Sequence, residues 1–338
     1  MTLVTETDLA HRQGRPRVIL TRRLLPAVET RMGELFELMP NPDDTPMSRE
    51  ELAAAMRDCD VLVPTVTDRI DGELIRQAGK RLGLIANFGA GTEHIDIDAA
   101  RARGIVVTNT PSVFTDDTAD LTMALILFVM RRFGENERVL QRGEWTGWGP
   151  SAMLGSTLSG KRLGIVGMGR IGQAVAHRAR AFGLDVSYHN RRPLPAAIEA
   201  SFGAHFESDL DRLIAQSDIL SLHCPALPGG APLMDARRFA LMKPSACLIN
   251  TGRGQLVDEQ ALIDALCNAR IAGAGLDVFA NEPHVNPALL ALPNLVALPH
   301  LGSATHEGRG AAGDKIIANI RFWVDGHRPP DQVLPELA

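Results

Sequence analysis

Short apolar runs alternate with amphipathic segments along the first third of the chain. Four runs have the length and composition of buried strands: residues 17–21, 61–64, 84–87 and 106–108. Between the runs, apolar side chains recur at helical spacing and predict three helices: residues 24–38, 71–78 and 98–103. Ser48 and Glu51 form a capping-box pattern, which predicts a further helix that reaches Arg57. Because strands that alternate with helices form a parallel sheet covered on both faces, this part predicts an α/β layer.

A second series of strand candidates begins at residue 162. Its members are residues 162–166, 185–189, 219–223, 246–250, 273–277 and 295–297. An apolar helix over residues 115–132 joins the two series and carries Asp116, Asp117 and Asp120 near its start, where acidic side chains favour a helix N-terminus. A last helix over residues 304–324 is too short for a third domain, so we expect it to return to the first series.

The fold class that follows is α/β, with two doubly wound parallel-sheet domains of the Rossmann or flavodoxin type. The length of 338 residues also favours two domains. We expect residues 1–111 with 302–338 to form a substrate domain and residues 112–301 to form a dinucleotide-binding domain. Ligands of such folds bind in clefts, and we expect the substrate in a cleft between the two domains.

A glycine-rich turn opens the second series. The strand that ends at Val166 runs into Gly167-Met168-Gly169-Arg170-Ile171-Gly172, and helical spacing follows. In a dinucleotide site the first glycine permits the turn, the second lets the backbone approach the pyrophosphate, and the third allows close packing. The phosphates lie at the helix N-terminus, so Arg170 and Ile171 are also candidate cofactor contacts. The glycine pattern alone also fits a purely structural turn, and the flanking strand and helix favour the cofactor site.

The end of the next strand bears on the choice between NAD and NADP. An acidic residue that accepts the ribose hydroxyls usually lies about 20 residues beyond the first glycine, and here Asn190 takes that place. Arg191 and Arg192 follow, and both could pair with a 2′-phosphate that a carboxylate would repel. The alternative is that both arginines are solvated loop residues. We therefore predict that NADP(H) is preferred and that NAD(H) is possible.

Composition and charge exclude several other classes. The net charge of −5 and the aromatic content of 4% argue against a nucleic-acid partner. The first 15 residues are polar, without a signal-peptide core, and we expect a loose tail there. The most apolar run, residues 121–130, is about half the length that crosses a bilayer. Four separated cysteines and ten histidines without ligand-like spacing indicate a cytoplasmic protein without a metal site.

Polar side chains that could carry chemistry follow three later strands. Arg253 lies in Asn250-Thr251-Gly252-Arg253-Gly254, and a guanidinium can bind a carboxylate through two hydrogen bonds. Asp277 and Glu282 follow the next strand, and His300 follows the last one. Histidine titrates near neutrality and is a candidate proton donor. Taken singly, Arg253 could cap a loop and His300 could be a packed structural histidine.

The order of these motifs resembles the D-isomer-specific 2-hydroxyacid dehydrogenase family, and within it the glyoxylate/hydroxypyruvate reductases. The resemblance rests on the glycine turn, the Arg253 motif, Gly275-Leu276-Asp277-Val278-Phe279 with Glu282-Pro283, and Pro299-His300-Leu301-Gly302-Ser303-Ala304-Thr305. Upstream it extends to residues 89–96, 104–111 and 143–145, so that it covers residues 61–324. Asn190 departs from the family's acidic residue, and Gly252 replaces a more common alanine.

The resemblance implies a reaction and a role for each candidate residue. Hydride passes from the nicotinamide to a 2-keto acid, Arg253 binds the substrate and polarises its carbonyl, and His300 donates the proton. Glu282 holds His300 in its charged form. Two groups of further contacts are implied: cofactor contacts at Thr251 and Asp277, and substrate-carboxylate contacts at the backbone of Ala90 and Gly91. Each of these residues could instead have only a structural role.

The resemblance also implies a homodimer, because the helix after Thr115 is similar to the family's dimerisation element. Trp148 stands where some such reductases place a tryptophan in the partner's site, with packing inside its own chain as the alternative. Other functions stay open: reduction of a bulkier 2-keto acid, phosphoglycerate, formate or phosphite oxidation, and dinucleotide sensing by a binding protein of the corepressor type.

Overall fold

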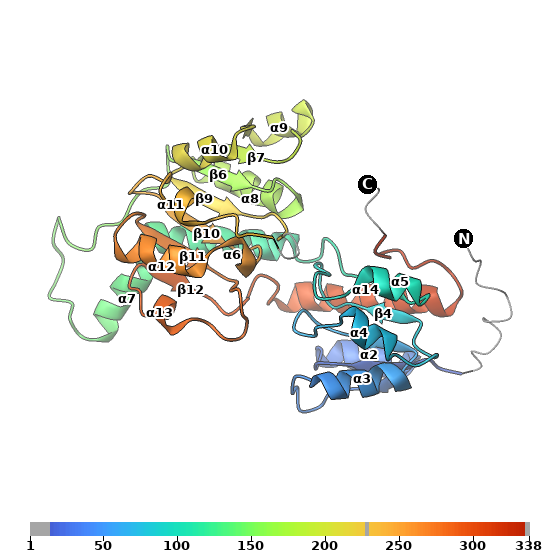
Figure 1. The fold of residues 1–338 in the computed structure, drawn as a ribbon. Coiled ribbons are helices and arrows are strands. Elements are labelled where there is room, and N and C mark those ends of the chain that lie inside the picture. Colours follow the sequence, from blue (N-terminus) through green and yellow to red (C-terminus); the bar gives the residue numbers. More distant parts are fainter. Residues whose placement is uncertain (1–13, 227–229, 335–338) are drawn as a thin grey trace. The chain divides into compact units, whose positions relative to one another are not determined.

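The computed structural model describes residues 14–226 and 230–334 (Figure 1). The chain divides into two compact units, one running to Phe114 and resuming at Thr305, the other from Thr115 to Ala304. Each junction lies three residues beyond the boundary expected from the sequence, because helix α6 begins at Thr115 and Thr305 caps the last helix. The expected tail falls largely on residues 1–13, outside the described residues.

The first unit contains a parallel sheet of five strands. In spatial order the strands are β2 (Glu37–Met39), β1 (Arg17–Leu20), β3 (Val61–Val63), β4 (Leu84–Ala86) and β5 (Val106–Thr108). The helices are α2 (Pro26–Leu35), α3 (Arg49–Asp58), α4 (Gly72–Arg76), α5 (Ile97–Ala102) and α14 (His306–Val324). Val18 and Leu20 pack with α2 and α14, whereas Ile19 packs with α3, α4 and α5, so that alternate side chains bury both faces.

One element near the N-terminus differs from the sequence expectation. The helix expected over residues 24–38 ends at Leu35, and residues 37–39 form the edge strand β2 beside β1. The buried, extended Phe36 ends the helix and turns the chain into the sheet. The capping box at Ser48 and Glu51 is confirmed, since the side chain of each accepts a hydrogen bond from the backbone N–H of the other.

The second unit contains a parallel sheet of seven strands. In spatial order they are β12 (Leu295–Ala297), β11 (Gly273–Leu276), β10 (Cys247–Asn250), β9 (Ile219–Leu222), β6 (Arg162–Val166), β7 (Asp185–His189) and β8 (His205–Phe206). The strand order reverses between β6 and β9, and ligands of such sheets bind beyond the strand ends at this reversal. The short β8 was not expected from the sequence.

Helices cover both faces of this second sheet. On one face α6 (Thr115–Met130) and α8 (Arg170–Ala181) share a core with β6 and β7. The other face packs against α10 (Leu210–Gln216), α11 (Ala236–Phe239), α12 (Glu259–Cys267) and α13 (Pro287–Leu290). The remaining helical elements are α7 (Phe133–Gln141), α9 (Ala196–Phe202) and the 3-10 turn η1 (Gly254–Leu256). None of the helices in the described part of the chain is both long and apolar enough to span a bilayer.

Candidate functional site

The glycine turn lies between β6 and α8, at the reversal of the strand order. Gly167 has a φ of 98°, and a Cβ there would lie 2.6 Å from the backbone nitrogen of Cys224. A Cβ on Gly172 would lie 2.4 Å from the carbonyl oxygen of Gly167, so that the close packing of strand and helix requires glycine. At Gly169 a Cβ would meet no atom within 4 Å, and no side chain caps α8. The turn therefore presents open backbone at a helix N-terminus, which fits a pyrophosphate.

The loop after β7 reaches back to this turn. The side-chain oxygen of Asn190 accepts a hydrogen bond from the Met168 N–H at 2.8 Å. Because a backbone N–H can only donate, the amide oxygen of Asn190 must face the turn, and its NH2 group remains a donor. Arg191 and Arg192 are exposed, and neither makes an ion pair or hydrogen bond with another described residue. Three consecutive residues thus carry donor groups, and none of the three carries a carboxylate.

Glu282 and His300 form a hydrogen-bonded pair at the carboxyl edge of the second sheet. The Nδ1 atom of His300 lies 2.7 Å from Oε2 of Glu282. The other oxygen of Glu282 accepts the Phe279 N–H at 2.8 Å, which fixes the carboxylate. Since Nδ1 faces Glu282, Nε2 is the ring nitrogen left for a substrate. The two residues predicted to act together are therefore brought together.

The charges around the pair favour its ionised form. The hydrogen bond to Glu282 raises the pKa of His300 above its usual value, although burial and the positive charge of Arg253 oppose this. Burial works to raise the pKa of Glu282, but the hydrogen bonds from His300 and Phe279 and the charges of His300 and Arg253 lower it overall. An imidazolium held by a carboxylate keeps its proton to a higher pH than a histidine without such a partner, which suits a proton donor.

Arg253 follows β10 and belongs to the same group, because its charge acts on both Glu282 and His300. Its loop is held by Asn250, whose side chain accepts from Gly252 N–H at 3.0 Å and donates to the Arg253 carbonyl at 2.9 Å. Gly254 lies so close to the loop after β11 that a Cβ there would lie 1.9 Å from the Phe279 carbonyl carbon. This close approach brings the Arg253 loop beside the loop that carries Glu282.

Asp277 supports the loop of His300. Its side chain is 1% exposed, and its two oxygens accept hydrogen bonds from the Leu301 N–H at 2.7 Å and the Gly302 N–H at 2.8 Å. Burial raises the pKa of Asp277, while the two backbone hydrogen bonds oppose the rise. The carboxylate is thus engaged with the chain itself, and each oxygen keeps a lone pair for a further donor.

Two buried threonines of α6, which were not predicted from the sequence, also hold the site loops. Thr118 donates a hydrogen bond to the Gly302 carbonyl at 2.9 Å. The hydroxyls of Thr122 and Thr251 lie 2.8 Å apart, so that Thr251 faces α6. The one signal in the sequence is their spacing of four residues, which places them on one helix face.

The glycine-rich loop after β4 has its carbonyl groups bound and two N–H groups free. Asn87 donates to the carbonyls of Gly89 and Gly91 at 3.1 and 2.8 Å, and Asn109 donates to that of Ala90 at 2.7 Å. The N–H groups of Ala90 and Gly91 have no acceptor among the described residues. Adjacent free N–H groups suit an anion such as a carboxylate. The roles of Asn87 and Asn109 were not predicted, because no pattern in the sequence indicates them.

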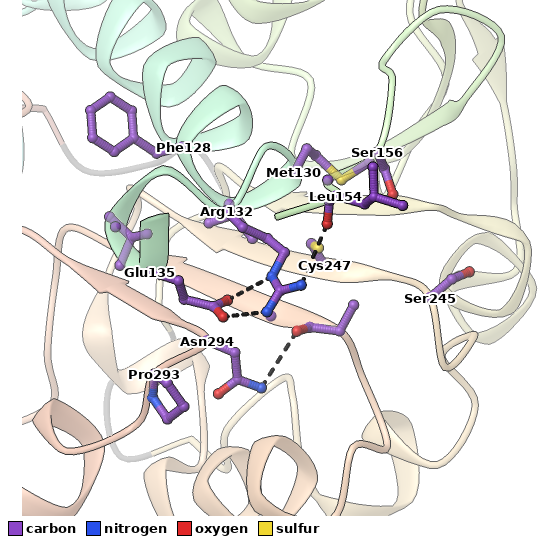
Figure 2. Close-up of a pocket in the computed structure, with 16 residues that line it drawn as sticks. Phe128, Met130, Arg132, Glu135, Leu154, Ser156, Ser245, Cys247, Pro293 and Asn294 are labelled. Atoms are coloured by element: carbon purple, nitrogen blue, oxygen red, sulfur yellow. Dashed lines mark hydrogen bonds and ion pairs between the residues drawn. The ribbon is translucent and has the colours of Figure 1, made fainter. Parts of the chain in front are cut away.

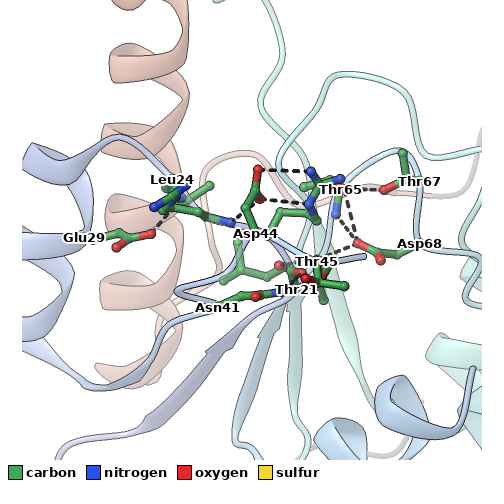
Figure 3. A network of polar contacts seen from close by, with 12 residues as sticks. Thr21, Leu24, Glu29, Asn41, Asp44, Thr45, Thr65, Thr67 and Asp68 are labelled. Atoms are coloured by element: carbon green, nitrogen blue, oxygen red, sulfur yellow. Dashed lines mark hydrogen bonds and ion pairs between the residues drawn. The ribbon is translucent and has the colours of Figure 1, made fainter. Parts of the chain in front are cut away.

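A buried carboxylate stabilises the neighbouring loops of the first unit. Figure 3 shows Asp68 beside Thr21 and Thr65, which follow β1 and β3. Asp68 is 2% exposed and accepts from the Thr21 hydroxyl at 2.5 Å and from the Thr65 N–H at 2.7 Å. Thr65 in turn pairs with Phe88, the residue before Gly89. The network thus fixes the base of the glycine-rich loop.

The second unit also contains a pocket at the amino ends of β10 and β11 (Figure 2). Cys247 and Gly273, the first residues of β10 and β11, line it, whereas the predicted catalytic residues follow the carboxyl ends of β10, β11 and β12. The ion pair of Arg132 and Glu135 spans its wall. None of the predicted site residues lines this pocket.

Comparisons with known proteins identify the family of the chain. Residues 123–302 match the model of the D-isomer specific 2-hydroxyacid dehydrogenase NAD-binding domain. The chain is 45% identical over 326 residues to a glyoxylate reductase of Thermococcus litoralis, with 94% of this chain and 97% of that protein covered.

Solved structures show the same fold. A protein of Thermus thermophilus is 42% identical with a TM-score of 0.87, and the match covers 94% of this chain and 100% of that one. An NADPH-dependent glyoxylate/hydroxypyruvate reductase of Sinorhizobium meliloti, solved with NADP and malonate, is 35% identical with a TM-score of 0.83, covering 94% and 97%. The second unit is a domain that binds a nicotinamide dinucleotide, and the chain belongs to the D-isomer specific 2-hydroxyacid dehydrogenase family.

Proposed function

We propose that the protein reduces a small 2-keto acid, glyoxylate or hydroxypyruvate, to the 2-hydroxy acid with NADPH. The Glu282–His300 pair beside Arg253 carries the proposal, because it supplies a proton donor and a carboxylate-binding cation at one place. The names of the relatives from Thermococcus litoralis and Sinorhizobium meliloti support this substrate class. In this proposal the second unit holds the dinucleotide.

The residues have distinct roles in the proposed reaction. Bound NADPH supplies the hydride that reaches the keto carbon. Arg253 binds the 2-keto acid and stabilises negative charge on the keto oxygen. His300 gives its Nε2 proton to that oxygen, and Glu282 stabilises the imidazolium before the transfer and orients the ring. In the reverse direction, His300 in its neutral form accepts the hydroxyl proton.

The substrate carboxylate is proposed to bind the free N–H groups of Ala90 and Gly91. Their carbonyls are held by Asn87 and Asn109, which leaves the N–H groups directed away from these amides. Hydrogen bonds from backbone donors to an anion are stronger than neutral ones. A loop fixed in this way would bind a carboxylate without further rearrangement.

The cofactor contacts are proposed at the turn and at the loop after β7. Gly167, Gly169, Arg170, Ile171 and Gly172 would surround the pyrophosphate at the start of α8. The NH2 group of Asn190 and the guanidinium groups of Arg191 and Arg192 would bind the 2′-phosphate, which NADH lacks. Thr251 and Asp277 would lie on the nicotinamide side, where Asp277 still has lone pairs for a donor.

Initial rates with a panel of 2-keto acids and both reduced cofactors test the proposal. We expect turnover of glyoxylate and hydroxypyruvate, with a higher kcat/KM for NADPH than for NADH. Higher efficiency with NADH would refute the cofactor preference alone. Absence of turnover with every small 2-keto acid would refute the reductase function and favour a dinucleotide-binding protein without this activity.

We also propose a homodimer formed through the C-terminal end of α6, helix α7 and the segment that follows α7. Of the 15 exposed large hydrophobic side chains among the described residues, seven lie in this stretch: Phe128, Phe133, Leu140, Trp145, Trp148, Met153 and Leu154. Helix α7 buries none of its own residues. Trp148 is 85% exposed, so packing within its own chain does not account for it. A second copy would cover this apolar surface.

A further inference from the structure

A buried phenol holds the C-terminal end of the loop that carries Arg191 and Arg192. Tyr188 lies on β7 with 0% of its side chain exposed, and its hydroxyl accepts a hydrogen bond from the Leu194 N–H at 2.7 Å. The same hydroxyl donates to Oε1 of Glu199 on α9 at 2.6 Å. The tyrosine therefore joins both ends of the connection between β7 and α9.

We propose that Tyr188 is a positioning residue for the 2′-phosphate of NADP(H), acting through the loop of Arg191 and Arg192. This inference rests on the proposed NADPH preference and adds a residue that does not touch the cofactor. Two hydrogen bonds hold the loop: Asn190 accepts one from the Met168 N–H, and the Leu194 N–H donates one to Tyr188. The three residues between Asn190 and Leu194 are exposed.

The tyrosine is suited to this role because its own position is fixed. Its ring packs in the core of the second unit, 5.4 Å from that of Phe206, and β7 pairs with β6 on one side and β8 on the other. Burial and the hydrogen bond to Glu199 raise the pKa of Tyr188 to about 12, so the hydroxyl keeps its proton at neutral pH. It can then donate to Glu199 and accept from Leu194 at the same time.

The consequence is specific to one cofactor. Long arginine side chains lose conformational freedom when they bind a phosphate, and a mobile backbone increases that cost. NAD(H) has no 2′-phosphate and makes no use of the arginine pair. A more mobile loop should thus weaken the binding of NADP(H) and leave the binding of NAD(H) nearly unchanged. A general loss of structure in the second unit would weaken the binding of both cofactors.

The test is calorimetric binding of NADP⁺ and NAD⁺ to wild type and Tyr188→Phe, which keeps the ring and removes the hydroxyl. We expect the Kd for NADP⁺ to rise about three- to tenfold, as for the loss of one net hydrogen bond, and that for NAD⁺ to change less than about twofold. Binding of 2′,5′-ADP should weaken like that of NADP⁺, and binding of 5′-AMP should stay constant. Leu194 also packs on the core, which limits the effect to this size.

Two further variants separate positioning from general stability. Phe206→Leu loosens the packing beside Tyr188 without removing its hydrogen bonds, so it should lower Tm but keep the ratio of the two affinities. Glu199→Ala keeps Tyr188 in the core and removes its acceptor, and should lower the NADP⁺ preference in the same direction but less. If Tyr188→Phe does not fold, the NADP⁺ preference of Glu199→Ala tests the inference instead.

The outcomes distinguish this inference from the function on which it rests. If wild type binds NADP⁺ more tightly than NAD⁺ and the preference falls in Tyr188→Phe, the inference holds. If the wild-type preference is unchanged in both Tyr188→Phe and Glu199→Ala, the inference is overturned and the NADPH preference stands. If wild type binds NAD⁺ as tightly as NADP⁺, the NADPH preference fails, and the role of Tyr188 fails with it.

Discussion

At the scale of single residues, the site consists of side chains whose partners are mostly backbone groups. Glu282 is held by Phe279, Asp277 by Leu301 and Gly302, and Asn190 by Met168. The sequence predicted Arg253, Glu282 and His300 because each follows a strand, and parallel strands bring their carboxyl ends to one edge. It did not predict Thr122, since its partner Thr251 is 129 residues away.

The proposed roles of Glu282 and His300 predict a pH dependence of keto-acid reduction. Because the pKa of His300 is raised, its protonated form persists to a higher pH than that of a histidine with the ordinary pKa. In Glu282→Gln the charge is lost, so the pH above which keto-acid reduction declines should move to lower values. A pH profile of kcat/KM measures this, and an unchanged profile would contradict the role of Glu282.

The same two shifts have a consequence for stability. Because the pKa of His300 is raised in the folded chain, its protonation stabilises the fold at low pH, and this stabilisation is lost as the pH rises through the folded pKa. Because the pKa of Glu282 is lowered, its ionisation stabilises the fold above the unfolded pKa, and this stabilisation is lost on acidification through the folded pKa. The pair therefore stabilises most between the two titrations. The difference in Tm between wild type and Glu282→Gln should be largest in this window and shrink on both sides.

Asn190 tests the choice between the cofactors. In Asn190→Asp a carboxylate oxygen can still accept the Met168 N–H, so the turn should be retained. The added negative charge would repel a 2′-phosphate and accept the ribose hydroxyls instead. We expect kcat/KM to fall with NADPH and to rise with NADH. A variant that loses both activities equally would show that Asn190 acts only on the structure of the turn.

At the scale of elements, strand ends and the helix α6 hold the site together. Most strands were predictable because they are short apolar runs, whereas β2 and β8 were not, since they are edge strands of three and two residues with exposed positions. The support from Thr118 and Thr122 could not be predicted either, because a helical pattern shows which face is buried but not which loop it contacts.

A substitution of Gly254 tests whether the close approach of the Arg253 and Glu282 loops is needed for stability and turnover. Gly254→Ala would place a Cβ against Phe279 and force the Arg253 and Glu282 loops apart. We expect a loss of stability of about 1–3 kcal/mol, the usual cost of overpacking, together with a larger fall in kcat than in cofactor affinity. Gly310→Ala on α14 is the control, because its Cβ meets no atom within 4 Å and should leave activity unchanged. Equal behaviour of both variants in denaturation and turnover would contradict the argument.

At the scale of the whole molecule, the two parallel-sheet units were predictable because the alternation of strands and helices is regular in each. The proposed homodimer rests on the exposed apolar side chains between Phe128 and Leu154. Leu140 is 62% exposed on α7, and Leu140→Glu should shift the chain from dimer to monomer in light scattering. The matched control is Ile198→Glu, at an exposed position of α9, which should leave the proposed dimer intact. A wild-type monomer would contradict the proposed assembly.

His300 is proposed to give the proton that accompanies hydride transfer to a small 2-keto acid. The rate of glyoxylate-dependent NADPH oxidation by wild type and His300→Ala, with the Kd of NADPH measured on both, tests this role. We predict turnover by wild type, a fall in kcat of about 10²–10⁴-fold in the variant, and an unchanged Kd. A variant that retains the wild-type rate would contradict the account.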